Sequence, residues 1–163
     1  YEQHELGYNY RMTDLQAALG ISQLQRLDTY VTQRNMLADR YDALLGGLPL
    51  KRPWRSAEHR SACHLYVIRL DQPRIHRAVF EALRADGIWV NLHYTPVHLQ
   101  PYYQRLGFAA GDFPHAEAHG ATAISLPLYP AMSNADVERV TATLKQAINS
   151  QQTDKETEDA LLS

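Results

Sequence analysis

The pattern of apolar and polar positions over residues 14–45 predicts a helix. Apolar residues recur there mostly at steps of three and four, the period of an amphipathic helix whose apolar stripe faces a core. Thr13 and Gln16 have the spacing of a capping box, so the helix should begin near the start of this range. Low helix propensity predicts a bend or break at residues 28–29, and the Gly-Gly-Leu-Pro of residues 46–49 should end the helix.

The remainder of the chain alternates between short β-rich runs and helical patterns. Runs rich in β-branched and aromatic residues predict strands at 64–71, 88–92 and 123–130. Apolar periodicity and capping residues predict helices at 74–85, 99–106, 114–120 and from Ser133 to about Ile148. A strand–helix–strand order is typical of an α+β layer in which the helix covers one face of the sheet.

Composition narrows the class of protein. The 163 residues are 45% hydrophobic and 21% charged, which predicts one soluble globular domain with a core. The net charge of −2 gives no electrostatic reason to expect nucleic acid or a membrane as partner. The single cysteine, Cys63, excludes an internal disulfide and fits a reducing, cytoplasmic location. The polar segment from 149 onward is predicted to be disordered.

Two polar side chains precede the first predicted helix. Asn9 and Arg11 are separated by one aromatic residue and follow a turn at Gly7. An amide and a guanidinium ahead of a helix N-terminus suit a phosphate or carboxylate, because unpaired N–H groups and the helix dipole favour an anion there. The alternative is an Asn that serves the turn and an Arg on the surface.

A second polar segment, residues 93–103, leaves a predicted strand. It contains two histidines and three tyrosines on a turn stiffened by two prolines. Imidazole and hydroxyl groups on such a loop can hold a polar ligand or move protons near neutral pH. The alternative is that these side chains only bridge core and solvent. His115 and His119 have a spacing that can bind zinc, but without further ligands we expect them to face solvent, and no metal is expected.

The residues of both segments resemble a known family. The string Gly-Tyr-Asn-Tyr-Arg-Met-Thr-Asp-Leu-Gln-Ala-Ala-Leu-Gly of residues 7–20 resembles a hallmark segment of the DegT/StrS-type sugar aminotransferases. The pattern His-Tyr-x-Pro-x-His-x-x-Pro-Tyr at 93–102 and Ser-Leu-Pro-Leu-Tyr-Pro at 125–130 resemble the same family. Its members are pyridoxal-phosphate (PLP) enzymes that aminate keto-sugars carried on nucleotides. Within it, the chain most resembles enzymes that act on a UDP-linked 4-keto-6-deoxy-hexosamine in pseudaminic acid biosynthesis.

The resemblance implies a fold and a domain organisation. The chain is similar to the C-terminal part of a fold-type I aminotransferase: a small α+β domain, with an antiparallel sheet covered by helices on one face, after a long helix from the large domain. This implies the end of the large domain at 1–45, the small domain at 46–149 and a tail at 150–163. Because Tyr1 lies inside a motif and is no initiator Met, we expect a portion of a longer protein.

The resemblance also implies site residues. Asn9 would reach the PLP phosphate of a neighbouring subunit in a homodimer, and Arg11 would support that phosphate or the substrate. The residues implied on the substrate side are Tyr8, Tyr10, His93, Tyr94, His98 and Tyr102. The amino donor would be glutamate.

Family chemistry also requires a lysine that holds PLP as a Schiff base and shuttles a proton. Lys51, Lys145 and Lys155 do not match the family's lysine segment, so no catalytic residue is assigned in this chain and we expect it to be inactive alone. The alternative is a non-catalytic module that dimerises or binds a sugar nucleotide.

Overall fold

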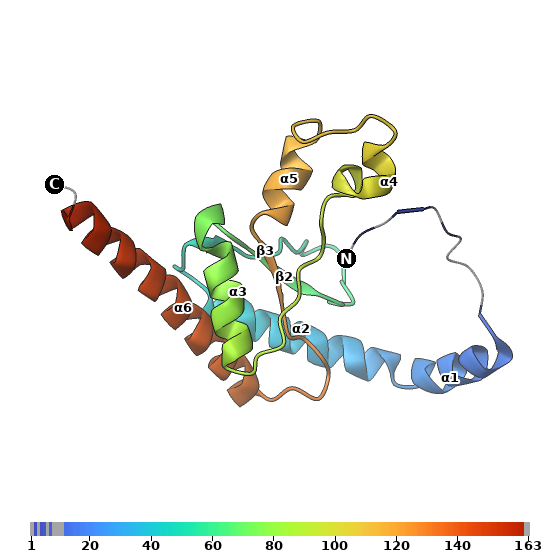
Figure 1. The fold of residues 1–163 in the computed structure, drawn as a ribbon. Helices are drawn as coiled ribbons and strands as arrows, with labels where there is room; N and C mark the ends of the chain where they lie inside the picture. The colour runs from blue at the N-terminus through green and yellow to red at the C-terminus, as the bar shows by residue number, and fades with distance from the viewer. Residues whose placement is uncertain (1, 3, 6, 8–11, 162–163) are drawn as a thin grey trace.

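The computed structural model describes residues 2, 4, 5, 7 and 12–161 (Figure 1). Two helices open this part of the chain, α1 (Asp14–Leu24) and α2 (Leu27–Leu44). The Gln16 N–H donates to Thr13 Oγ1 at 3.3 Å, and the Thr13 N–H donates to Gln16 Oε1 at 2.8 Å. This capping box confirms the predicted helix start.

The predicted long helix is broken, slightly before the expected position. Arg26 leaves helical geometry, with φ −107° and ψ 0°, and α2 begins directly after it. The helix pair ends as predicted near the glycines, where Gly47 takes φ +80°, a conformation that glycine adopts without steric cost.

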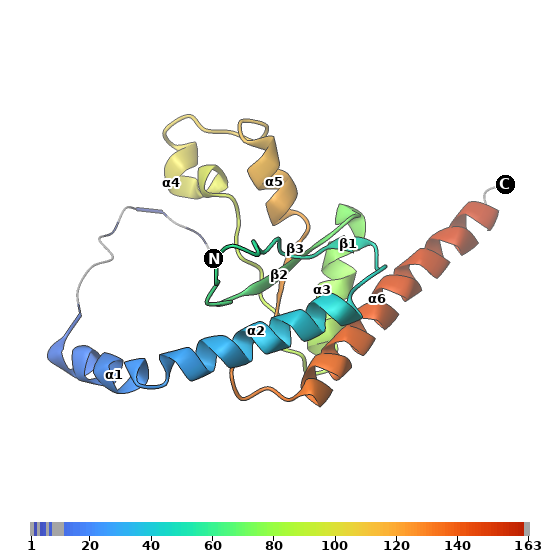
Figure 2. The same cartoon turned by 180° about the vertical axis from the view of Figure 1, so that it is seen from behind.

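The prediction that the apolar stripe forms core is confirmed for α2 and wrong for α1. Leu37, Ala38 and Tyr41 of α2 are buried, whereas α1 has no buried residue and its Leu15 is 85% exposed. In Figures 1 and 2 α1 extends beyond α2, away from the sheet. Helical periodicity therefore marks an apolar face correctly without showing that this chain covers it.

A three-stranded antiparallel sheet forms the centre. Its order is β1 (Leu50–Lys51), β2 (Tyr66–Leu70), β3 (Ala123–Leu126), with Ile68 opposite Ile124. The prediction of a strand at 88–92 is wrong, because the structure has no strand there. The Val90 N–H bonds to the carbonyl of Ile88 at 3.0 Å, so the backbone turns locally and pairs with the sheet only through a bridge between Asn91 and Ser125.

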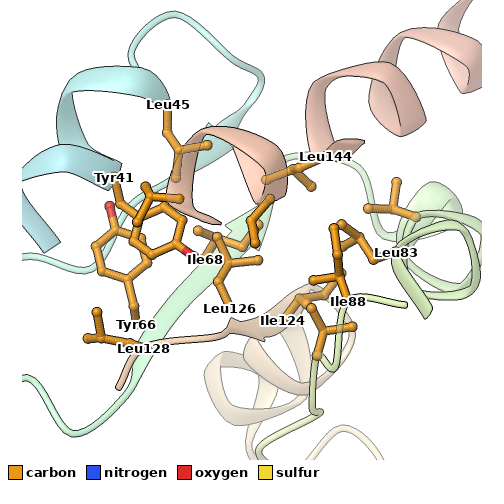
Figure 3. Close-up of a cluster of buried hydrophobic side chains, with 14 of the residues drawn as sticks. Tyr41, Leu45, Tyr66, Ile68, Leu83, Ile88, Ile124, Leu126, Leu128 and Leu144 are labelled. Carbon is orange, nitrogen blue, oxygen red and sulfur yellow. The ribbon is translucent and has the colours of Figure 1, made fainter. Parts of the chain in front are cut away.

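Helices cover one face of this sheet. A short 3₁₀ turn, η1 (Pro73–Ile75), leads into α3 (His76–Ala85), which packs against α6 (Asn134–Leu161). Figure 3 shows the core between these helices, α2 and the sheet. Of the side chains that the sequence places inward on α3 and α6, Phe80 is only partly buried against the core. The others on these two helices are buried, namely Val79, Leu83, Val137, Val140, Leu144 and Ile148. The α+β class with a small antiparallel sheet is confirmed.

The last helix is longer than predicted. Ser133 caps α6, as expected, through a 3.2 Å hydrogen bond from the Asp136 N–H to Ser133 Oγ. The helix continues beyond Ile148 into the segment predicted to be disordered. Gln, Lys and Glu in that segment are good helix formers, so polarity alone did not predict its backbone conformation. Among the described residues, no helix is long and apolar enough to cross a membrane.

Candidate functional site

Four predicted site residues lie outside the described part of the chain: Tyr8, Asn9, Tyr10 and Arg11. Of the other four, His93 and Tyr94 lie between the Asn91–Ser125 bridge and a small helical unit, whereas His98 and Tyr102 belong to that unit. That unit consists of η2 (Val97–Leu99), α4 (Pro101–Gln104) and α5 (Pro114–Gly120). Both views show α4 and α5 side by side beyond the sheet (Figure 2). The bounds of α5 are those the sequence predicts, and the helix predicted at 99–106 is divided into η2 and α4.

His93 is fixed to strand β3. Its Nδ1 lies 2.7 Å from Oγ of Ser125, a buried residue of β3, and its ring meets that of Tyr94 edge-on at 4.5 Å. Tyr94 is 60% exposed. The peptide bond between the two residues is cis. A hydrogen bond at Nδ1 orients the imidazole, so that Nε2 is the nitrogen that can meet a ligand.

A cavity of about 320 Å³ lies beneath this segment, and we call it the His93 cavity. It is lined by Leu92, His93, Tyr94, Thr95, Pro96, Leu99, Glu117, Gly120, Ala121 and Ala123. Two of the four described site residues, His93 and Tyr94, therefore share one wall. The lining is mostly apolar with a few convergent polar groups, which is typical of a small-molecule site.

Gly120 lets the site segment approach α5 closely. A Cβ atom at this position would lie 2.9 Å from Cδ of Pro96 and 3.4 Å from the carbonyl oxygen of Tyr94. Contacts under 3 Å are sterically forbidden for ordinary carbon atoms, so only glycine permits this packing. The C-terminal end of α5 therefore forms the support on which residues 94–96 rest.

His98 lies below the surface and has a carboxylate partner. Its side chain is 6% exposed, and Nε2 lies 2.9 Å from Oε1 of Glu117 on α5. The same oxygen accepts the N–H of Gly111 at 2.8 Å and that of Phe113 at 3.4 Å. The hydrogen bonds from His98 and Gly111 hold the pKa of the Glu117 carboxyl below its usual range.

Sequence reasoning missed Glu117. It is separated from His98 by nineteen positions, and no local pattern joins them. The only sequence signal was an acidic residue in the first turn of a helix that begins with proline.

Tyr102 lies apart from the His93 cavity. Its ring meets that of Tyr103 edge-on at 5.2 Å, and the guanidinium of Arg105 lies 5.8 Å from its centroid. The structure thus places this residue in the aromatic group of α4. His115 is exposed, and among the described residues no group of three His, Cys, Asp or Glu side chains could hold a metal ion.

The residues around the His93 cavity do not by themselves fit a PLP group. Among the residues that the structure describes, no lysine and no arginine lines the cavity. Lys51 lies on β1 and Lys145 on α6, and both are exposed. The described lining of the His93 cavity therefore offers a few hydrogen-bonding groups to a ligand, without an amine for a Schiff base.

A larger hollow, of about 640 Å³, lies between α2 and the loop after β1. Arg55 donates there to Asp39 at 2.6 Å and to Asp42, and the Tyr66 hydroxyl donates to Asp42 at 2.6 Å. Burial and the hydrogen bond to Asp42 raise the pKa of Tyr66. Because these charges pair with one another, the network stabilises the loop. None of the four site residues that the structure describes lines the hollow.

Comparisons with known proteins identify the family of this chain. Residues 1–145 match the model of the DegT/DnrJ/EryC1/StrS aminotransferase family. The chain belongs to this family. A relative of this chain is the spore coat polysaccharide biosynthesis protein SpsC of Bacillus subtilis. It is 38% identical over 154 residues, which are 91% of this chain and 40% of SpsC.

Solved structures of family members share the fold. Spr1654 of Streptococcus pneumoniae, described as a sugar aminotransferase, superimposes in its apo form with a TM-score of 0.83 at 30% identity, over 89% of this chain and 37% of that one. The PLP form of the same protein superimposes with a TM-score of 0.80 at 31% identity, over 85% of this chain and 36% of that one. PseC of Helicobacter pylori is an aminotransferase involved in pseudoaminic acid biosynthesis. It superimposes with a TM-score of 0.78 at 27% identity, over 90% of this chain and 40% of PseC.

The chain therefore spans about 40% of the length of the relatives it matches. The structures of Spr1654 in PLP and PMP forms agree with the PLP dependence expected from the sequence. Membership of the family, the fold and the cofactor class of the family are thus established.

Proposed function

We propose that this chain supplies the sugar side of the active site of a PLP-dependent aminotransferase. The reaction would transfer an amino group, with glutamate as donor, to a keto-sugar linked to a nucleotide. The observation that carries the proposal is the His93 cavity. The match to the family model, over residues 1–145, includes both segments that resemble the family, 7–20 and 93–102. The name of SpsC supports a role in surface polysaccharide biosynthesis.

Three of the four described site residues have a proposed part in sugar binding, and His98 supports the loop instead. His93, oriented by Ser125, would present Nε2 to a sugar hydroxyl or keto oxygen and could hold or release a proton there. Tyr94 would add a hydroxyl at the same wall of the cavity. Tyr102 would act only at its margin, because it does not line the cavity.

The other predicted residues would act from the segment before α1. We propose that Asn9 and Arg11 bind the PLP phosphate of a neighbouring subunit, with Tyr8 and Tyr10 flanking it, which requires a homodimer. When bound, PLP supplies an electron sink for the amino-group transfer. The single Cys63 suits a reducing compartment, so we place the reaction in the cytoplasm.

The second candidate is a non-catalytic module that binds a sugar nucleotide. It is favoured by one observation, the lack of a lysine in the lining of the His93 cavity. Both candidates share the sugar site and differ in whether a lysine from elsewhere completes it.

The sugar site can be tested by calorimetric titration with a UDP-linked 4-keto-6-deoxy-hexosamine. His93→Ala should weaken binding roughly tenfold, as expected when a good hydrogen bond to a ligand is lost. Leu106→Ala, at an exposed residue outside the cavity, should leave the dissociation constant unchanged. No binding by the unmodified chain would contradict the proposal.

The lysine question is tested by intact mass after incubation with PLP and reduction with borohydride, which makes a Schiff base stable. We expect no stoichiometric adduct on this chain. A single adduct mapped to Lys51, Lys145 or Lys155 would show that the chain carries its own PLP lysine and that our placement of the chemistry is wrong.

A further inference from the structure

One carboxylate connects three parts of the helical unit beside the His93 cavity. Oε1 of Glu117 accepts hydrogen bonds from His98 Nε2 at 2.9 Å, from the Gly111 N–H at 2.8 Å and from the Phe113 N–H at 3.4 Å. We call these four residues the Glu117 cluster. It joins η2, the loop before α5 and α5 itself through a single acceptor.

The cluster is closed from solvent on the His98 side. The ring of His98 packs against that of Phe113, with centroids 4.9 Å apart. The side chain of His98 is 6% exposed and that of Glu117 is 24% exposed. A hydrogen bond to a charged acceptor in such a partly dry place is stronger than one in water. The cluster should therefore restrict the motion of residues 97–113.

Two residues of α5 hold neighbouring parts of the site segment. Glu117, in the first turn of the helix, binds His98, and Gly120, at its C-terminal end, contacts Pro96. Tyr94 and Thr95 directly precede the contact at Pro96, and Glu117 and Gly120 also line the His93 cavity. Release of His98 from Glu117 would remove the hydrogen bond that fixes the C-terminal end of residues 94–98 on α5.

We propose that Glu117 is a positioning residue that acts through His98 to hold the Tyr94–Pro96 segment over the His93 cavity. In this assignment His98 is a link between Glu117 and the loop, and His93 alone of the two histidines meets the sugar. The functional consequence of this positioning rests on the proposed sugar site. The structural argument rests on the hydrogen bonds of the Glu117 cluster.

The variants that test it are Glu117→Ala, Glu117→Gln and Glu81→Gln. Gln keeps an oxygen that can accept the same N–H groups, whereas Ala keeps none. Glu81 on α3 is the matched control, because its carboxylate is exposed and bonds only to Arg77, one turn away, at 2.8 Å.

The first readout is amide hydrogen exchange together with amide chemical shifts of the whole chain. In Glu117→Ala we expect exchange at Gly111 and Phe113 to be faster by about tenfold or more, since local opening no longer breaks a charged hydrogen bond. Shifts of Tyr94, Thr95 and His98 should move as well. Glu117→Gln should restore most of the protection, and Glu81→Gln should change none of these signals.

The strand amides of Ile68 and Ile124 separate local release from global unfolding. Unchanged protection there, with loss at the Glu117 cluster, supports the proposal. Two results would overturn it: unchanged shifts at residues 94–95 in Glu117→Ala, or loss of protection that is as large in β2 and β3 as in the loop.

The second readout separates this inference from the proposed function. By calorimetric titration with the UDP-linked keto-sugar, Glu117→Ala should raise the dissociation constant roughly tenfold and Glu117→Gln should restore most of the affinity, since the loop binds the sugar and does not react. An unchanged dissociation constant in Glu117→Ala would contradict the positioning role. If no form of the chain binds the sugar, the proposed function is wrong, while the exchange data still decide the role of Glu117 in the loop.

Discussion

At the scale of single residues, the two histidines of the site segment differ in environment. His93 bonds to a buried serine of β3 and lines the cavity, whereas His98 is buried and bonds to a carboxylate. The same residue type, five positions apart, is therefore suited to ligand contact in one case and to loop support in the other. What distinguishes them is the partner at each ring nitrogen.

A buried tyrosine gives a stability prediction at this scale. The Tyr41 hydroxyl donates to the Pro127 carbonyl at 2.9 Å, and the Tyr41 side chain has no exposed surface. Tyr41→Phe should lower the free energy of unfolding by about 1–3 kcal/mol, because the carbonyl would be left without a donor. Urea unfolding measures this change. Tyr129→Phe, at a half-exposed residue, is the control and should change the value by less than about 0.5 kcal/mol.

At the scale of elements, the ends of helices decide what each helix supports. α6 begins with a hydrogen-bonded cap, α5 ends in a glycine that admits Pro96, and α1 begins with a capping box but buries nothing in this chain. Local signals thus define where helices start and stop, and the packing of each helix depends on its neighbours.

The cap of α6 predicts a pH dependence. The N–H and hydroxyl of Ser133 donate to Asp136 Oδ2 at 2.7 and 2.8 Å and lower the pKa of this carboxyl. A lowered pKa in the folded state stabilises the fold above the ordinary aspartate pKa of about 3.9, and this contribution is lost as the pH decreases through the folded value. Thermal unfolding should therefore show Asp136→Asn less stable than the parent at pH 7, with the difference shrinking below about pH 4. A difference that grows in acid would contradict this assignment.

The contact at the end of α5 predicts opposite results for two glycines. Gly120→Ala should lower the free energy of unfolding by about 1 kcal/mol or more, because steric overlap with Pro96 outweighs the better helix propensity of alanine. Gly20→Ala in α1 has no atom within 4 Å of its new Cβ and should increase helix content by far-UV circular dichroism. Stabilisation by Gly120→Ala would show that residues 94–96 do not rest on α5 in solution.

At the scale of the whole molecule, the chain has one covered core and one uncovered helix. The core joins α2, β2, β3, α3 and α6. Helix α1 extends away from this core (Figure 1), and its large apolar side chains are exposed. A large exposed apolar surface is typical of an interface with another polypeptide. This agrees with the homodimer of the proposed function.

The exposed face of α1 predicts self-association. At micromolar concentration the chain should sediment as a dimer or larger species, and Leu15→Lys combined with Leu19→Lys should shift it toward monomer, because charge on an apolar interface is unfavourable. Leu106→Lys places the same charge at an exposed leucine outside α1 and should not change the sedimentation coefficient. A monomeric parent chain would contradict the prediction.

The sequence by itself determined the features that depend on neighbouring residues. The capping box at Thr13, the bounds of α5, the inward face of α6 and the family were all predicted, because caps, turns and helical periodicity act within a few positions. The site segment at His93 and Tyr94 was also indicated, by residue type on a proline-rich turn.

Only the tertiary structure decided the features that join distant parts of the chain. It placed β1 beside β2 and turned the backbone at Val90 where a strand was predicted. It paired His98 with Glu117, left α1 without a cover, and separated Tyr102 from the cavity. Strand pairing and partners for buried polar groups depend on which surfaces meet after folding, and a pattern along the chain does not contain that information.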